Sequence, residues 1–318
     1  MRTGDGFAEA LRAGDVAAVR RFPKTDFHAH SYLSARIESL ERELGQALPR
    51  PPRRMDGLTG MSEFVTPAIN PYFNTAEGAE FAATAAAADA IDDGVSILEM
   101  SFDALTPRHY PDGLQGLLGF VRSLVEQCRD RIRLRPELGI SRRYICAADL
   151  MDLALPAIAS DIFTSIDLYD VEDACAPEDA QPLYAQARAQ GMMLKAHVGE
   201  FSSADDVRRT VEVLDLDEVQ HGVAAADSTD VMRWLAEQGV RLNVCPTSNV
   251  MLGVVSDIES HPIRRLHDHG VAVTVNTDDL TVFGQSVSDE YLNLFRAGVF
   301  TAEELDGIRV AALASRRA

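Results

Sequence analysis

Eight apolar runs typical of β-strands alternate with helical patterns along the 318 residues of this chain. The strand-like runs cover 24–30, 95–102, 132–140, 162–168, 193–197, 218–221, 241–245 and 271–277. Several of the helical patterns begin at a Ser or Thr and end at a Gly, as helices commonly do. Strands that alternate with helices form parallel sheets, and eight such units predict a TIM-like (β/α)8 barrel. We therefore expect a single barrel domain over residues 1–318.

One long segment, residues 31–74, lacks clear periodicity and is rich in proline. It directly follows the first strand-like run, so it should lie over the carboxyl ends of the barrel strands. Barrel enzymes carry their active sites at that end, and long insertions there often act as lids. We expect residues 31–74 to form an inserted helical or loop lid that influences substrate choice.

Polar residues that can bind a metal stand at the ends of four of the strand-like runs. His28 and His30 end the first run, and residues two apart on a strand point to the same face. His197 and His221 end the fifth and sixth runs, and Asp278 follows the last one. Because the carboxyl ends of barrel strands meet at one mouth, we expect these side chains to converge.

Three neutral imidazoles and one carboxylate make a good Zn²⁺ shell with an open position for water. The predicted ligands of one zinc ion per chain are His28, His30, His197 and Asp278. The metal would lower the pKa of the bound water to about 7. Glu200, three residues after His197, would manage the proton, while His221 and Asp278 would orient the water and take its proton.

A second His-x-His pair, His267 and His269, does not share this context. The residues around it have a helical pattern that leads into the last strand-like run. On a helix, side chains two residues apart do not face each other. We expect this pair to lie at a solvated helix end.

The charge of the chain limits its partners. Lys and Arg number 30 against 49 Asp and Glu, which gives a formal net charge of −19. This field repels phosphate backbones, so we expect a small-molecule substrate and no nucleic acid polymer. The sequence contains neither a signal-peptide pattern nor an apolar run long enough to span a bilayer, and its four cysteines form no CxxC pair. We expect a cytoplasmic protein without a membrane partner, and the oligomeric state is left open.

The order of these motifs resembles that of the adenosine deaminase family of metal-dependent hydrolases, in the amidohydrolase superfamily. The family pattern is a PK-x-x-x-H-x-H strand followed by H-x-G-E, H-G, C-P-x-S and N-T-D-D. This chain has PK at 23–24 before His28 and His30, HVGE at 197–200, HG at 221–222, CPTSN at 245–249 and NTDD at 276–279. The resemblance covers nearly the whole chain, from about residue 8 to about residue 314.

The resemblance implies hydrolytic deamination of an adenine-type ring, and its zinc ligands are the four residues named above. Glu200 would protonate a ring nitrogen, which makes the adjacent amine-bearing carbon electrophilic. His221 would help to activate the water, and Asp279 would bind the purine. The tetrahedral adduct would then lose ammonia, as in other zinc deaminases that use a Glu beside the metal.

The residues with which the family recognises a nucleoside are altered in this chain. The family's first His pair is followed by Leu-Asp-Gly, whose Asp contacts the sugar, whereas this chain has Ser31, Tyr32 and Leu33. The family's D-L-A-G turn is replaced by DLYD at 167–170. We expect deamination of a changed substrate, such as a modified adenosine, free adenine, an N6-substituted adenine or another aminopurine. The expected substrate contacts are Asp279, Gly199, Ser31, Tyr32 and Tyr169.

Two alternatives stay open. The chain could be a zinc hydrolase on the same scaffold that cleaves a different C–N or amide bond. It could also be a non-catalytic member that keeps the fold for binding, although the presence of all four ligands and Glu200 argues against this. Tyr32 and Tyr169 could stack on a substrate ring, crowd out a ribose, or simply pack under the lid.

Overall fold

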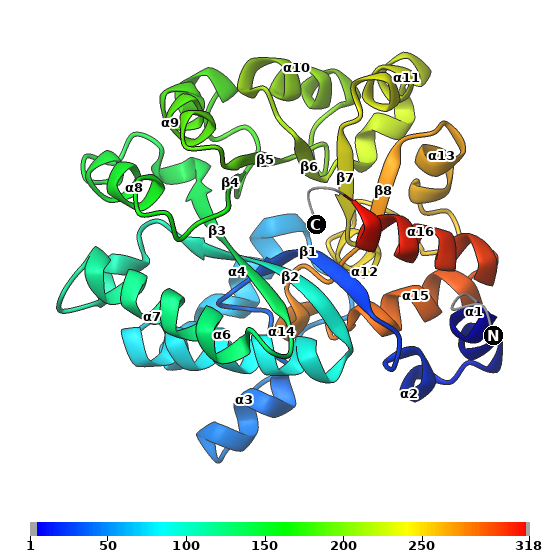
Figure 1. Cartoon of the computed structure of the whole chain (residues 1–318), viewed down its shortest axis with the longest axis horizontal. Coiled ribbons are helices and arrows are strands. Elements are labelled where there is room, and N and C mark those ends of the chain that lie inside the picture. The colour runs from blue at the N-terminus through cyan, green and yellow to red at the C-terminus, as the bar shows by residue number, and fades with distance from the viewer. Residues whose placement is uncertain (1–4, 316–318) are drawn as a thin grey trace.

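A barrel of eight parallel strands lies at the centre of the molecule (Figure 1). The structure is a computed structural model and describes residues 5–315. Each strand pairs with the next in chain order. The strands are β1 Lys24–His30, β2 Val95–Asp103, β3 Arg133–Ser141, β4 Ser165–Tyr169, β5 Met193–Val198, β6 Glu218–His221, β7 Arg241–Val244 and β8 Ala272–Val275. The ring closes between its first and last strands where the backbone N–H of Asp278 donates to the carbonyl of His28 at 2.9 Å. The predicted (β/α)8 barrel is confirmed, although β4 begins at Ser165 rather than at residue 162.

Helices surround the barrel (Figure 1), and several of them follow a capping Ser or Thr, as the sequence predicts. They are α1 Asp5–Ala13, α2 Val16–Val19, α3 Ile37–Leu44, α4 Gly57–Ala68, α5 Asn70–Phe73, α6 Ala76–Asp92, α7 Leu114–Cys128, α8 Leu150–Ile158, α9 Pro177–Ala189, α10 Ala204–Leu214, α11 Thr229–Gln238, α12 Pro246–Met251, α13 Ile263–Asp268, α14 Leu280–Phe283, α15 Val287–Arg296 and α16 Ala302–Ala314, with 3₁₀ turns η1 Thr106–His109, η2 Arg142–Tyr144 and η3 Val223–Asp227. Thr75 and Ser203 cap α6 and α10 by accepting backbone N–H groups. His269 is exposed just beyond α13, as expected for a solvated helix end. Between residues 5 and 315, no helix combines the length and the apolar character that crossing a membrane requires.

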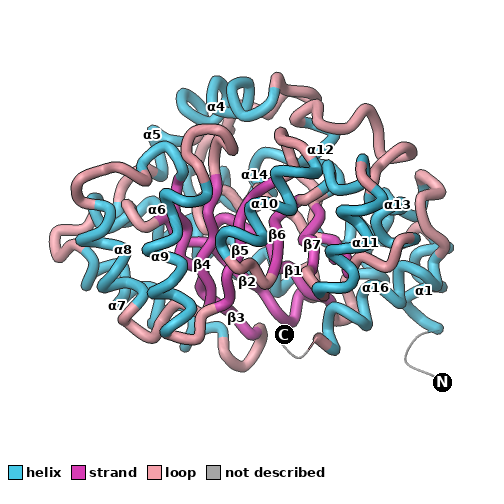
Figure 2. The backbone as a smooth tube through the Cα atoms, turned by 90° about the horizontal axis from the view of Figure 1, so that it is seen from above, coloured by secondary structure: helices cyan, strands magenta, loops and turns pink. Residues whose placement is uncertain are grey.

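Residues 31–74 cover the carboxyl ends of the strands. Figure 2 shows α4 and α5 above the strands, on the side where α12 and α14 follow β7 and β8. Backbone hydrogen bonds from Met55 to Met251 (2.7 Å) and from Gly57 to Leu252 (3.1 Å) tie this segment to the end of α12. The segment contains three helices, α3, α4 and α5, none of which begins with a side-chain cap. We call residues 31–74 the lid.

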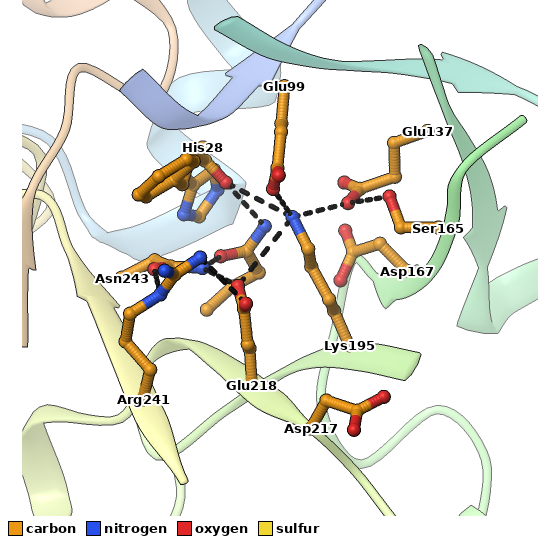
Figure 3. Close-up of polar contacts among 12 residues, drawn as sticks. His28, Glu99, Glu137, Ser165, Asp167, Lys195, Asp217, Glu218, Arg241 and Asn243 are labelled. Carbon is orange, nitrogen blue, oxygen red and sulfur yellow. Dashed lines mark hydrogen bonds and ion pairs between the residues drawn. The ribbon is translucent and has the colours of Figure 1, made fainter. Parts of the chain in front are cut away.

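A buried ion cluster fills the barrel one layer below the carboxyl ends (Figure 3). The ammonium of Lys195 contacts the carboxylates of Glu99 and Glu137, and it lies 3.9 Å from Glu218. Arg241 adds a second cation, 2.6 Å from Glu218. Mutual pairing offsets the cost of burying these charges. Since Lys195 is held by carboxylates, it serves the barrel interior rather than the mouth above it.

Candidate active site

The residues predicted at the strand ends converge at the carboxyl end of the barrel. The ring centroid of His28 lies 5.3 Å from that of His30, and 4.6 Å from those of both His197 and His221. Asp278 Oδ1 is 3.4 Å from His28 Nε2 and 3.3 Å from His30 Nε2. Side chains from β1, β5, β6 and the segment after β8 therefore meet in one cluster.

This cluster fits one metal ion. One ligand atom from each of His28, His30, His197 and Asp278 lies within 4.8 Å of the other three. Both ring nitrogens of His28 are buried without a hydrogen-bond partner, a costly state unless something else binds them. Three imidazole nitrogens and one carboxylate are donors typical of Zn²⁺. Cys245 lies nearby, but burial followed by the charge of Asp278 raises the pKa of its thiol, and a protonated thiol is a poor ligand.

Neighbouring polar groups orient the candidate ligands. Asp167 on β4 lies 3.0 Å from Nδ1 of His197, and the hydroxyl of Ser248 donates to Oδ2 of Asp278 at 2.7 Å. Such outer partners fix ring orientation and ligand basicity in metal sites. Asp278 also has a φ of +65°, which non-glycine residues rarely adopt and which often marks a functional site. The contact of Asp167 with His197 depends on the pairing of β4 with β5, so the sequence gives no direct sign of it.

Glu200 and His221 lie together beside Asp278. Oε2 of Glu200 is 3.5 Å from Nε2 of His221, which is 3.8 Å from Oδ2 of Asp278. The amide nitrogen of Asn249 lies 3.2 Å from Oε1 of Glu200 and 3.2 Å from Nδ1 of His221. Nε2 of His261 lies 3.3 Å from the amide oxygen of Asn249, which fixes that amide. Asn249 belongs to the CPTSN motif, but the motif alone assigns it no role.

Burial, followed by the charges of nearby carboxylates, raises the pKa of Glu200 well above its ordinary value. Burial likewise lowers the pKa of His221, so its imidazole is neutral. A carboxylic acid beside a neutral imidazole is the protonation state that general acid catalysis at a purine nitrogen requires. The pair can therefore hold a proton and deliver it into the barrel mouth.

Glu172 holds the loop that carries Glu200. Its carboxylate accepts the backbone N–H groups of Gly199 (2.7 Å), Glu200 (2.9 Å) and Phe201 (2.7 Å), and also the hydroxyl of Ser202. A side chain at Gly199 would come within 2.3 Å of Val207, and its φ of +74° favours glycine. The N–H of Gly199 is thus used inside the loop, and this residue is not among those that line the cavity described next. Its predicted substrate contact finds no support in this geometry.

A cavity of about 720 Å³ opens above the cluster, under the lid. This volume falls in the range of small-molecule sites. The predicted substrate residues Ser31, Tyr32, Tyr169 and Asp279 all line it. Oδ1 of Asp279 is buried there without a hydrogen-bond partner, which leaves it free for a ligand. Tyr32 is anchored in the lid, since its hydroxyl donates to Asn70 at 2.7 Å.

Comparison with known proteins adds independent information. Residues 74–316 match the adenosine deaminase family, so the match includes β5 to β8 but not β1 or the lid. A protein of Treponema pallidum named as an adenosine/adenine deaminase is 40% identical over 91% of this chain and 98% of its own length. An adenine deaminase of Acinetobacter baylyi is 31% identical over 69% of this chain and 67% of its own. The crystal structure of an adenine deaminase from Arthrobacter aurescens covers 92% of this chain and 94% of its own, with a TM-score of 0.77 at 22% identity.

Proposed function

Because the chain belongs to the adenosine deaminase family, and is therefore a hydrolytic enzyme acting on C–N bonds, we propose that it is a zinc-dependent deaminase of free adenine. The observation that carries the proposal is the contact of Glu200 with His221 beside the cluster of three imidazoles and Asp278. The names of the relatives from Treponema pallidum and Acinetobacter baylyi support adenine as the ring.

In this proposal His28, His30, His197 and Asp278 would hold the zinc ion, which would supply a water of lowered pKa when bound. Glu200 delivers its proton to a ring nitrogen of adenine, so that the neighbouring carbon accepts the water oxygen. Asn249 occupies Nδ1 of His221, which leaves Nε2 to donate and to orient the water. The bond from that carbon to the amine then breaks. One water proton ends on the ring through Glu200 and the other leaves with ammonia, so hypoxanthine is the product.

The charges around the cavity support a neutral substrate rather than a nucleotide. The basic lid residues Arg50, Arg53 and Arg54 are not among the residues that line the cavity. Arg108 and Arg143 do line it, but they pair with aspartates, at 2.6 Å and 2.8 Å respectively. Carboxylates already in place thus neutralise part of the positive charge at the cavity rim.

Glu200→Gln tests this proposal. The variant should keep its zinc by elemental analysis and lose roughly 10²- to 10⁴-fold of the rate of ammonia release, the range expected for a general acid. Glu212→Gln, a charge removal on the exposed part of α10, is the control and should leave both unchanged. Full activity of the Glu200 variant would refute the proton role. A zinc-loaded protein that is silent on all aminopurines would favour hydrolysis of a different C–N or amide bond.

A further inference from the structure

Tyr169 crosses one wall of the cavity, from β4 to β2. Its ring centroid lies 5.5 Å from that of His30 and 6.2 Å from that of His197, so one side of the ring faces the candidate ligands. At its far end the phenol hydroxyl donates to Oδ2 of Asp103, the last residue of β2. Tyr169 therefore links the ligand cluster to a carboxylate on another strand.

The strand between them makes room for this ring. A Cβ at Gly139, on β3, would lie 3.1 Å from Cε1 of Tyr169 and 2.6 Å from the hydroxyl of Ser101. Both distances are shorter than ordinary van der Waals contact, so a side chain at this position would displace the tyrosine. Gly139 and Tyr169 therefore pack closely and form a fixed part of the cavity wall.

Asp103 is held with its carboxylate in the cavity. The backbone N–H of Leu105 donates to Oδ1 at 2.6 Å, while Tyr169 donates to Oδ2, and Asp103 lines the cavity. A carboxylate oxygen has two acceptor positions, so each oxygen keeps one for a ligand. Asp103 stands one tyrosine ring away from the histidine cluster. If a purine lies along Tyr169 with its amine-bearing carbon at the cluster, its imidazole edge faces Asp103.

The imidazole edge is where free adenine and adenosine differ chemically. Free adenine carries an N–H there, whereas adenosine carries its sugar. A carboxylate at Asp103 accepts hydrogen bonds, so it complements an N–H, whereas a sugar or a methyl group on that nitrogen removes the donor. We propose that Asp103, positioned by Tyr169, accepts the imidazole N–H of free adenine and so selects the base over the nucleoside. This inference rests on the proposed deaminase function and names the determinant of its substrate.

The test compares ammonia release from adenine, 9-methyladenine and adenosine by the zinc-loaded protein. The wild type should prefer adenine to 9-methyladenine by about 100-fold or more in kcat/KM, because the methyl group removes the donor and leaves the carboxylate unpaired. Asp103→Asn should lower kcat/KM for adenine roughly 10- to 100-fold and leave 9-methyladenine nearly unchanged. Tyr169→Phe keeps the ring and should show a smaller loss, again for adenine only. Glu126→Gln, on an exposed carboxylate of α7 that pairs with Arg129 at 2.6 Å, should change neither substrate.

Three results would overturn the inference. The first is equal kcat/KM of the wild type for adenine and 9-methyladenine, which needs no variant to fold. The second is an Asp103→Asn variant that loses the same factor on both bases. The third is a preference for adenosine that Asp103→Asn removes, since Asp103 would then bind a sugar hydroxyl. Silence on all three substrates would instead refute the deaminase function itself, and with it this inference.

Discussion

Replacing Glu172 with Gln tests whether the loop that carries Glu200 is positioned by one carboxylate. Glu172 accepts three backbone N–H groups and one hydroxyl, whereas glutamine has a single acceptor oxygen. Whichever way the amide turns, its NH₂ faces donors in the loop. Two charge-assisted hydrogen bonds are lost, each contributing about 1.5–3 kcal/mol. Because Glu172 is only half-buried, water replaces part of the lost hydrogen bonding. We therefore expect the unfolding free energy to fall by about 1–3 kcal/mol.

The loop also sets where Glu200 meets the substrate, so the same variant should lose activity. We expect kcat to fall roughly 10-fold or more while the zinc content stays that of the wild type, since Glu172 is not a candidate ligand. Urea unfolding, elemental analysis and initial rates measure the three quantities. Glu178→Gln, on an exposed carboxylate that pairs with Arg209 at 2.8 Å, is the matched control. A Glu172→Gln protein with wild-type kcat and an unchanged urea midpoint would refute this account of the loop.

Two further substitutions test the buried charges. Burial raises the pKa of Glu290 from 4.5 to about 8, despite a hydrogen bond from the N–H of Thr247. Between these two pH values the folded protein keeps a proton that the unfolded chain releases. The stability of the protein therefore falls as the pH rises from 4.5 to 8. Glu290→Gln should remove this loss of stability, which amounts to at most about 5 kcal/mol between pH 4.5 and 8. Urea unfolding of both proteins across this pH range measures it. A variant with the pH dependence of the wild type would contradict the raised pKa of Glu290. Lys195→Met should lower the unfolding free energy by about 3–5 kcal/mol, because Glu99 and Glu137 lose their buried cation. A urea unfolding midpoint equal to that of the wild type would show that the ion cluster tolerates the unpaired carboxylates.

The strand-end histidines were predictable because a barrel brings the ends of distant strands to one place. His28 and His30 share one face of a strand, and His197 and Asp278 stand at the ends of later strands. Strand periodicity and barrel topology are therefore enough to predict that these side chains converge. The position of residues 31–74 over the strand ends was also predictable, but the bounds of its helices were not, since none of them begins with a side-chain cap.

The partners of the site residues could not be predicted in the same way. The contacts of Asp167 with His197 and of Tyr169 with Asp103 depend on side-chain directions across neighbouring strands. Asp103 lies in no motif that the resemblance identifies. Glu172 lies in a loop between β4 and α9, where no periodicity indicates which way its carboxylate points. These contacts come from tertiary packing, which a single sequence does not encode in any local pattern.

The arrangement along the barrel axis explains how the metal site can persist while the substrate changes. On β5, Lys195 and His197 point to the same face two residues apart, so the lower one joins the ion cluster and the upper one joins the candidate metal cluster. Both layers are buried and paired within the barrel, where a substitution leaves a charge or ligand unpaired. Tyr169 and the lid lie above these layers, at the cavity wall, where a substitution alters mainly the shape and hydrogen bonding of the cavity. Substitutions at the cavity wall and in the lid can therefore alter which substrate fits without removing a candidate metal ligand or a charge of the ion cluster.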